Sequence, residues 1–234
     1  MKKVIKSFFQ TVAFLAIGVT FSACEQDKTT PDKWSFGNGE IRREVAVGGT
    51  YKFIISDYTC NDPYVGVLSP ADGTNQTFTA LHVGKCVLTT PNHKDSYGIT
   101  VTGTVDPFNG VSTAWGTTFS DMLKSLSLTE ESEGVDKAAQ TITVASGSEI
   151  HTYIFKNNQL TQASVYFDLD RIGETMILTY LTENFNFENT QGIYGKYFNQ
   201  STFAKATTWI EITRTEDVDR DHVANLYDAK KVPM

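Results

Sequence analysis

The chain of 234 residues lacks the short motifs that mark the common catalytic sites. It contains no H-E-x-x-H pair for zinc, no G-x-S-x-G nucleophile turn and no glycine-rich loop that would cradle a phosphate. Its few histidines share no ligand spacing, so we expect surface or structural roles for them: His82, His93, His151 and His222. We therefore predict no catalytic residues, no metal ligands and no cofactor, and we expect a protein that is not an enzyme.

The chain also lacks an excess of positive charge. It has 20 Lys and Arg residues and 27 Asp and Glu residues, which gives a formal net charge of −7. Nucleic acids and anionic lipids are bound by basic surfaces. The composition therefore argues against nucleic acid as a partner, and surface charge does not explain any attachment to a membrane.

A long apolar run is missing as well, although the N-terminus is strongly patterned. Lys2, Lys3 and Lys6 precede an apolar stretch from Val12 to Phe21, which small residues and Cys24 follow. This stretch is shorter than the roughly 20 residues that span a bilayer as a helix. A basic start, a short apolar segment and a small-residue cleavage site are typical of an export signal.

The segment FSAC, residues 21–24, resembles the lipobox of bacterial lipoprotein signal peptides. The resemblance implies that residues 1–23 are removed, and that Cys24 is lipidated and becomes the first mature residue. The alternative is a plain secretory signal with an ordinary buried cysteine. Under the lipoprotein reading, the acyl chains attach the protein to a membrane, and residues 24–39 form a flexible polar tether. Acidic Glu25 and Asp27 resemble export tags, so we expect an outer membrane lipoprotein at the cell surface or on the periplasmic face.

Cysteine is scarce, with only three residues in the chain. If Cys24 carries lipid, Cys60 and Cys86 remain as a candidate disulfide in an exported protein. The bond would close a loop of about 25 residues and contribute roughly 3 kcal/mol. Two separately buried thiols are the alternative, because sequence does not supply the distance between the Cα atoms.

Residues 40–105 contain short runs typical of β-strands, separated by turns, within 44–56, 64–69, 76–90 and 97–103. The segments VAVGGTYKF, TALHVGKCVLTT and YGITVTG resemble parts of the bacterial Ig-like domains of group 2. The usual middle strand with tryptophan is replaced by NDPYVGVLS. The resemblance implies an Ig-like β-sandwich that serves as a spacer or adhesion module.

After a predicted linker at 106–112, the period changes. Phe119, Met122, Leu123 and Leu126 form one helical face, and Thr118 with Asp121 resembles a capping box. We expect strands in 150–170, 174–185 and 207–215, with a tight hairpin at Asn157 and Asn158. The prediction for 113–234 is an α+β domain in which an antiparallel sheet packs against a helix, so the whole chain is mainly β with α+β. This layout resembles the C-terminal units of many exported lipoproteins of unassigned function.

We expect structural rather than catalytic or metal-binding roles for two groups of acidic residues. Asp168 and Asp170 are expected to be solvated turn residues rather than a catalytic pair. The run EDVDRD, residues 216–221, lacks the glycine and closing glutamate of a calcium loop. We expect it to begin a terminal helix over 217–226, because acidic side chains favour a helix N-terminus.

The aromatic segment at 184–198 offers a candidate ligand-binding platform. Phe185, Phe187, Tyr194 and Tyr197 alternate with amides, a mixture that suits sugar rings, although burial in the core is the alternative. The leading hypothesis is a membrane-anchored lipoprotein that acts as a binding or adhesion module for glycans. The second hypothesis is an envelope accessory subunit that docks a protein partner, for example through a free sheet edge.

Overall fold

The computed structural model describes residues 40–54, 57–70, 73, 75–91, 96–187, 192–217 and 219–234. The chain divides into two units, Met1–Trp34 and Ser35–Met234, of which the second contains all described residues. The predicted signal peptide, tether and lipidation site at Cys24 lie outside the described residues. Within them the protein is mainly β, with a few short helices.

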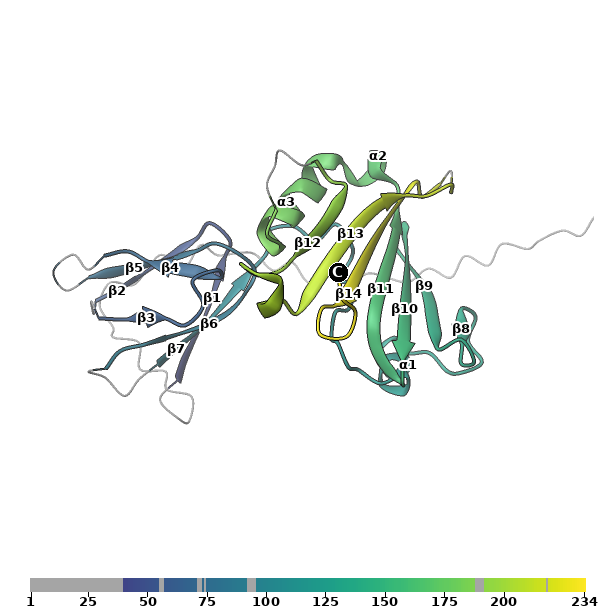
Figure 1. The fold of residues 1–234 in the computed structure, drawn as a ribbon, viewed down its shortest axis with the longest axis horizontal. Helices are drawn as coiled ribbons and strands as arrows, with labels where there is room; N and C mark the ends of the chain where they lie inside the picture. The colour runs from purple at the N-terminus through teal and green to yellow at the C-terminus, as the bar shows by residue number, and fades with distance from the viewer. Residues whose placement is uncertain are drawn as a thin grey trace, which may run out of the picture. The chain divides into compact units, whose positions relative to one another are not determined.

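The first part of the described chain forms two sheets (Figure 1). One sheet has the order β1-β7-β6-β3 and the other the order β2-β5-β4. Strand β1 runs parallel to β7, whereas all the other pairs in these two sheets are antiparallel. The strands are β1 (Glu40–Ala46), β2 (Thr50–Phe53), β3 (Thr59–Cys60), β4 (Gly66–Leu68), β5 (Gln76–Ala80), β6 (Gly84–Thr89) and β7 (Ser96–Thr102).

Both sheets contribute side chains to one hydrophobic core. Phe53 and Phe78 come from the second sheet, and Leu88 and Ile99 come from the first. Alternate positions are buried along β5, which is the period of two that a strand imposes. Two sheets with a common core therefore make up residues 40–102.

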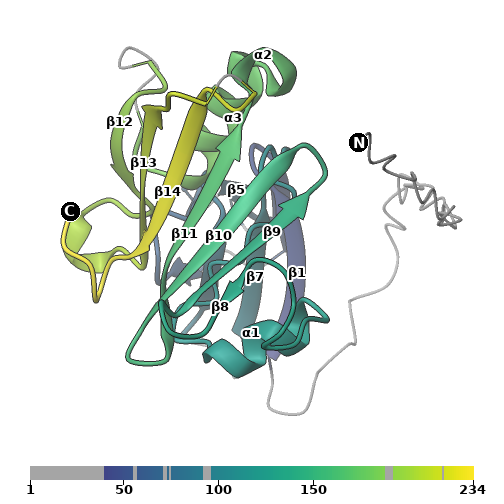
Figure 2. The same cartoon turned by 90° about the vertical axis from the view of Figure 1, so that its right-hand side faces the viewer.

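The second part is built on one sheet of seven antiparallel strands, with the order β12-β13-β14-β11-β10-β9-β8 (Figure 2). The predicted antiparallel sheet with a helix against it is confirmed in its outline. The strands are β8 (Val135–Asp136), β9 (Thr141–Ser146), β10 (Glu149–Lys156), β11 (Gln159–Phe167), β12 (Gly195–Phe198), β13 (Thr208–Arg214) and β14 (His222–Asp228). The helices are α1 (Phe119–Ser125), α2 (Leu169–Ile172) and α3 (Glu174–Asn184), and the 3-10 turn η2 covers Phe203–Lys205.

The hairpin between β10 and β11 confirms the prediction at the two asparagines. Asn157 and Asn158 have φ angles of 52° and 58°, in the left-handed region that asparagine tolerates. Asn158 also accepts a hydrogen bond from the backbone N–H of Phe119 at 3.2 Å. The turn therefore joins two strands and also holds the first residue of α1.

Helix α1 confirms the predicted apolar face and cap. The Thr118 hydroxyl accepts the backbone N–H of Asp121 at 3.2 Å and donates to the Asp121 carboxylate at 2.7 Å. Phe119, Met122 and Leu123 are buried against residues of β9, β10 and β11. Helix α1 and these residues form a hydrophobic cluster on the part of the sheet made by β9, β10 and β11.

Helix α3 corrects the prediction of a strand over 174–185. The fully buried positions are Ile177 and Leu181, four residues apart, and Phe185 continues the spacing directly after the helix. That spacing places all three on one helical face, which packs on β11, β13 and β14. The hydroxyls of Thr179 and Thr182 donate to carbonyls one turn earlier in the helix.

The C-terminal region corrects the expectation of a helix over 217–226, because His222–Asp228 is strand β14. Ala224 and Leu226 point into the core, whereas Asn225 and Tyr227 alternate with them and are less buried. The preceding acidic run forms the turn between β13 and β14. There the Asp217 carboxylate accepts the backbone N–H groups of Asp219 and Arg220 at 2.8 and 3.1 Å.

The segment 106–112, which was predicted as a linker, contributes a residue to the core of the second part. Phe108 is fully buried and lies against Phe167 and Tyr180, with ring centroids 5.5 and 5.0 Å apart. The Asp106 carboxylate accepts the backbone N–H groups of Phe108 and Gly110. The aromatic side chain of this segment therefore belongs to the core between α3 and the sheet.

Truncation of Leu181 tests the packing of α3. Leu181→Ala removes a fully buried side chain and should lower the free energy of unfolding by about 2–5 kcal/mol, because it leaves a cavity under the helix. Urea unfolding followed by circular dichroism measures the loss. Met176→Ala is the control on the same helix. Met176 is 41% exposed, so its substitution should change stability by no more than about 0.5 kcal/mol. Equal effects of the two changes would contradict the packing.

Candidate functional site

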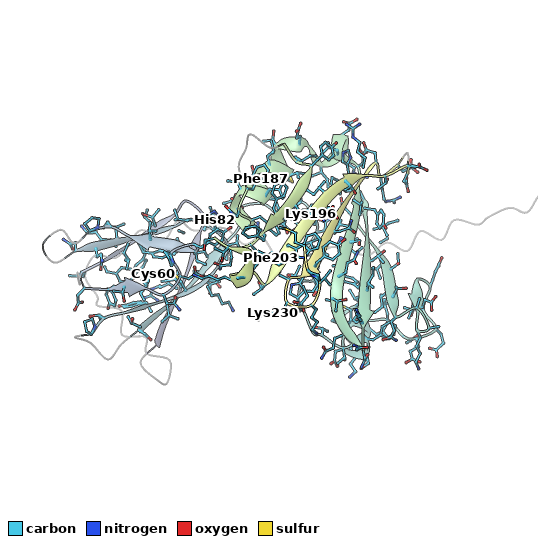
Figure 3. All side chains as sticks on the ribbon, viewed as in Figure 1. Cys60, His82, Phe187, Lys196, Phe203 and Lys230 are labelled. Atoms are coloured by element: carbon cyan, nitrogen blue, oxygen red, sulfur yellow. The ribbon has the colours of Figure 1, made fainter. Side chains whose placement is uncertain are left out.

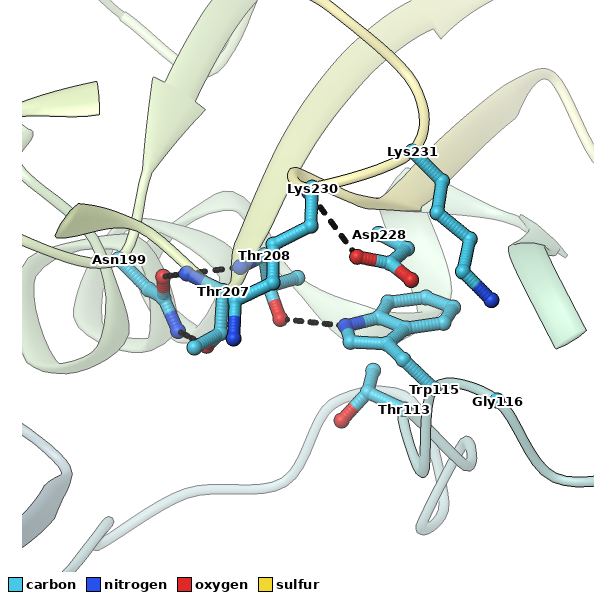
Figure 4. Close-up of a pocket in the computed structure, with 9 residues that line it drawn as sticks. All are labelled: Thr113, Trp115, Gly116, Asn199, Thr207, Thr208, Asp228, Lys230 and Lys231. Carbon is cyan, nitrogen blue, oxygen red and sulfur yellow. Dashed lines mark hydrogen bonds between the residues drawn. The ribbon is translucent and has the colours of Figure 1, made fainter. Parts of the chain in front are cut away.

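A cavity of about 460 Å³ lies at one end of the seven-stranded sheet, where β13 begins and β14 ends. Three segments line it: the loop before α1, the connection from β12 to β13, and the residues that follow β14 (Figure 4). This volume is within the range of sites that bind small molecules. The lining residues are Thr113, Trp115, Gly116, Asn199, Thr207, Thr208, Asp228, Lys230 and Lys231.

The connection from β12 to β13, which forms one wall of the cavity, is held by hydrogen bonds of the Asn199 side chain. The side-chain oxygen of Asn199 accepts the backbone N–H groups of Thr207 and Thr208, both at 3.0 Å. Its amide nitrogen donates to the Thr207 hydroxyl at 2.9 Å. Since both ends of this amide are engaged, the loop wall is rigid on the side of Asn199.

The residues that follow β14 form a second wall of the cavity and are also held by hydrogen bonds. The Asp228 carboxylate accepts the backbone N–H of Lys230 at 3.0 Å, and the Asp228 carbonyl accepts that of Val232 at 2.8 Å. The indole N–H of Trp209 donates to the carbonyl of Val232 at 2.9 Å. These bonds turn the chain back over the sheet and place two consecutive lysines at the cavity.

Trp115 supplies the aromatic surface of the cavity. Its indole N–H donates to the Thr208 hydroxyl at 2.8 Å, which fixes the ring against the start of β13. The ring is only partly buried and packs against the core clusters beneath both α1 and α3. The indole is therefore a positioned ring with part of its surface toward the cavity.

The charges of the cavity come from Asp228, Lys230 and Lys231. Figure 4 shows the two lysine side chains on either side of the Trp115 ring, with the Asp228 carboxylate near it. The Lys231 ammonium bonds the side-chain oxygen of Gln159, and Asp228 is 5% exposed. In a chain of net charge −7, this small region carries one more positive than negative group.

A second cavity of about 440 Å³ runs along α3 and is poorer in polar groups. Its ionisable side chain, Glu183, accepts hydrogen bonds from the backbone N–H and the hydroxyl of Thr104. Since that carboxylate already has two donors, this cavity offers little to orient a polar ligand.

The predicted aromatic platform is wrong for two of its four residues, Phe185 and Tyr197. Phe185 and Tyr197 are 2% and 4% exposed, and Phe187 packs against the same core (Figure 3). The rings of Phe185 and Tyr197 therefore have no face to offer a ligand, whereas Phe187 is half-buried. Tyr194 is 41% exposed.

Tyr194 belongs to a hydrogen-bonded chain at the opposite end of β13 and β14 from the cavity. Its hydroxyl lies 2.7 Å from Nε2 of His222, and Nδ1 of His222 lies 2.6 Å from the Asp221 carboxylate. The Arg214 Nε–H donates to the same hydroxyl at 2.9 Å. These bonds hold down the pKa of Asp221, mainly through His222, and raise that of Arg214, mainly through Tyr194.

Cys60 and Cys86 are two neighbouring thiols that are not bonded to each other (Figure 3 marks Cys60). The hydrogen bond from Cys86 lowers the pKa of Cys60 to about 7, with burial opposing it. The same bond and burial raise the pKa of Cys86. Both thiols are free, as in the alternative prediction, with Cys86 buried and Cys60 partly buried. The disulfide stays a prediction.

The remaining predicted positions show no shared site. Nδ1 of His82 lies 2.7 Å from the Tyr64 carbonyl, and His151 is buried, which lowers its pKa. Asp168 caps α2 by accepting the N–H of Asp170 at 3.0 Å, as expected for a turn residue. His93 lies outside the described residues. Within the described part of the chain, His, Cys, Asp and Glu side chains form no group of three or more suited to a metal.

Sequence reasoning missed the cavity residues and the chain of bonds around His222. Trp115 lies alone in a glycine-containing loop, and Lys230 and Lys231 form an ordinary basic pair near the end of the sequence. The pairing of Thr208 with Asp228 joins the start of β13 to the end of β14, and the bond from Trp115 to Thr208 adds the loop before α1. No local pattern in the sequence contains that information.

No protein-family model matches the chain, and no curated protein matches it. Among the described residues, no helix combines the length and apolar character needed to cross a bilayer.

The two thiols give a prediction that depends on pH. In the reduced protein, with Cys24→Ala to remove the third thiol, alkylation of Cys60 by iodoacetamide should reach half its maximal rate at about pH 7. Only the thiolate reacts, so the rate rises as pH increases through the pKa. Mass spectrometry of the Cys60 peptide measures it.

Cys86→Ala is the matched control, because it removes the hydrogen bond that lowers the pKa of Cys60. The midpoint should move upward toward that of an ordinary thiol. An unchanged midpoint would show that Cys86 has no influence on Cys60. Treatment with oxidised glutathione should abolish alkylation if the predicted disulfide forms.

Proposed function

We propose that the protein is an exported lipoprotein, anchored through Cys24, whose C-terminal sheet carries a glycan-binding site. The support for export and anchoring is the N-terminal pattern of lysines, short apolar run and FSAC. The support for the binding role is the cavity at the end of β13 and β14. The role assigned to the protein is binding or adhesion rather than catalysis.

We also propose that residues 40–105 are an Ig-like spacer of the bacterial group 2 kind. The support is a pair of sheets with one core, together with the three segments that resemble that family. A spacer of this kind would hold the binding domain away from the membrane. Residues 24–39 would supply the remaining distance as a tether.

The observation that carries the glycan proposal is the Trp115 ring flanked by Lys230 and Lys231. Aromatic faces stack on the apolar faces of sugar rings, and the exposed Thr113 offers its hydroxyl to those of a sugar. The two ammonium groups favour a sugar that carries a carboxylate or sulfate, because an acidic group gains a charge-assisted hydrogen bond there.

Docking of an envelope protein is the second candidate, and the sheet edges favour it less. Pairing with an added strand needs a long free edge. In the described part of the C-terminal sheet, the outer strands β12 and β8 have only four and two residues. The cavity therefore remains the better supported site of recognition.

Trp115→Ala tests the cavity. The mature protein should bind uronate-containing oligosaccharides in isothermal titration calorimetry, and the variant should bind at least about tenfold more weakly, since a stacked ring contributes about 1.4 kcal/mol or more. Met176→Ala is the control, because Met176 is 41% exposed on α3 and does not line the cavity. Equal binding by Trp115→Ala and the parent chain would exclude this cavity.

Cys24→Ala tests the anchor. The variant should move from the membrane fraction to the soluble fraction of lysed cells, because an acyl chain holds a protein through each buried CH₂. Protease treatment of intact and lysed cells, probed with an antibody to the C-terminal domain, then reports the membrane face. A variant that stays as firmly membrane-bound as the parent would contradict lipidation.

A further inference from the structure

The bonds around His222 form a directed chain from Asp221 to Tyr194. His222 is 2% exposed, so its imidazole exchanges little with solvent. Its ring lies between those of Phe167 and Tyr194, with centroids 5.5 and 5.6 Å away and small interplanar angles. The two aromatic neighbours fix the plane of the imidazole, which keeps Nε2 aimed at the tyrosine hydroxyl.

The partners of each atom settle the direction of the protons. The Asp221 carboxylate is an acceptor, so Nδ1 of His222 carries a hydrogen and donates to it. In the neutral ring, Nε2 is then an acceptor, and the Tyr194 hydroxyl donates to it. The same Asp221 oxygen also accepts the Leu169 backbone N–H at 3.2 Å, which holds the carboxylate in place.

Arg214 completes the arrangement from the other side of the hydroxyl. Guanidinium nitrogens only donate, so the Tyr194 oxygen accepts from Arg214 while its own proton points at His222. The Arg214 cation also lies 5.5 Å from the centre of the Tyr194 ring. A fixed cation at this oxygen stabilises negative charge that develops when the proton leaves.

This geometry fits a nucleophile with its base. A hydroxyl within hydrogen-bond reach of an imidazole, which a carboxylate orients in turn, is the arrangement that activates weak nucleophiles in covalent catalysis. Tyr194 is also accessible, at 41% exposure, whereas its base is shielded.

We propose that Tyr194 is a site of covalent acylation, with His222 as its general base, Asp221 as the residue that positions His222, and Arg214 as the stabiliser of the phenolate. The acyl donor is an activated ester. This site is separate from the glycan cavity and does not depend on it, because the two lie at opposite ends of the β13 and β14 pair.

The reaction balances without an oxidant or reductant. Nε2 of His222 takes the phenolic proton as the Tyr194 oxygen forms a bond to the ester carbonyl carbon. The tetrahedral intermediate then collapses, the bond to the leaving oxygen breaks, and the leaving group receives the proton from His222. The products are an acylated Tyr194 and a free alcohol or phenol.

The experiment uses p-nitrophenyl acetate as the donor and the mature full chain as the protein. Peptide mass spectrometry measures the rate of acetylation at Tyr194, with Tyr166, which is half-buried on the same sheet, as the internal reference. A positioned general base contributes about 10²- to 10⁴-fold, so we expect Tyr194 to react at least about tenfold faster than Tyr166. Equal rates at the two tyrosines would overturn the proposal.

Variants separate the chemistry from the folding of the sheet. His222→Gln should reduce acetylation of Tyr194 to the level of Tyr166. Because His222 is buried, Asp221→Asn serves as a second variant at an exposed carboxylate, and it should slow acetylation while leaving circular dichroism unchanged. Arg214→Lys keeps the charge without the fixed N–H and should have an intermediate rate. An unchanged rate at Tyr194 in a folded His222→Gln or Asp221→Asn protein would overturn the proposal.

Nitrogen NMR of the imidazole gives a readout that a purely structural role for Asp221 would leave unmoved. In the parent protein, Nδ1 of His222 should carry the proton and Nε2 should be the unprotonated nitrogen. Asp221→Asn should lower this tautomeric preference together with the acetylation rate. A proton on Nε2 in the parent protein would contradict the assigned base.

Discussion

The register between β13 and β14 is the constraint on which both candidate sites depend. Thr208 pairs with Asp228 at one end of this ladder, and Arg214 pairs with His222 at the other. The first pair lies at the cavity beside Trp115, and the second surrounds the hydroxyl of Tyr194. Between them, Ile210, Ile212, Ala224 and Leu226 point into the core. A slip of one residue would turn these apolar side chains outward and separate both polar groups, so burial of the core specifies the geometry of the sites.

The helices stabilise that register by covering one face of the sheet. Helix α3 packs over β11, β13 and β14, and α1 packs over β9, β10 and β11. Val111 and Trp115 contact both clusters, so the loop before α1 closes the junction between them. The indole of Trp115 therefore packs on the core with one part of its surface and lines the cavity with another. A rigid aromatic of this kind loses little conformational entropy on binding, which suits recognition of a weakly hydrophobic ligand such as a sugar.

Short sequence patterns predicted the turns and caps correctly, and they failed for segments whose secondary structure depends on tertiary packing. The cap at Thr118, the apolar face of α1 and the hairpin at Asn157 and Asn158 depend on neighbouring residues, and each was confirmed. Residues 174–185 were predicted as a strand, and Glu174–Asn184 form helix α3 instead. The core selected the helix by burying Ile177 and Leu181 on one face. Strand β14 was predicted as a helix. The acidic start suggested a helix, but pairing with β11 and β13 supplies its hydrogen bonds.

The sequence by itself determined the mainly β character, the local turns and caps, and the acidic balance that argues against nucleic acid. The proposal of a lipid anchor also rests on the sequence alone, because its evidence is a contiguous N-terminal pattern that does not depend on the fold. The tertiary structure alone decided which aromatic residues are available. It buried Phe185 and Tyr197, left Tyr194 exposed beside His222, and placed Trp115 next to Lys230 and Lys231. The physical reason is distance along the chain. Trp115 and Thr208 meet only because strands far apart in sequence pair in one sheet, and no local propensity encodes a contact of that kind.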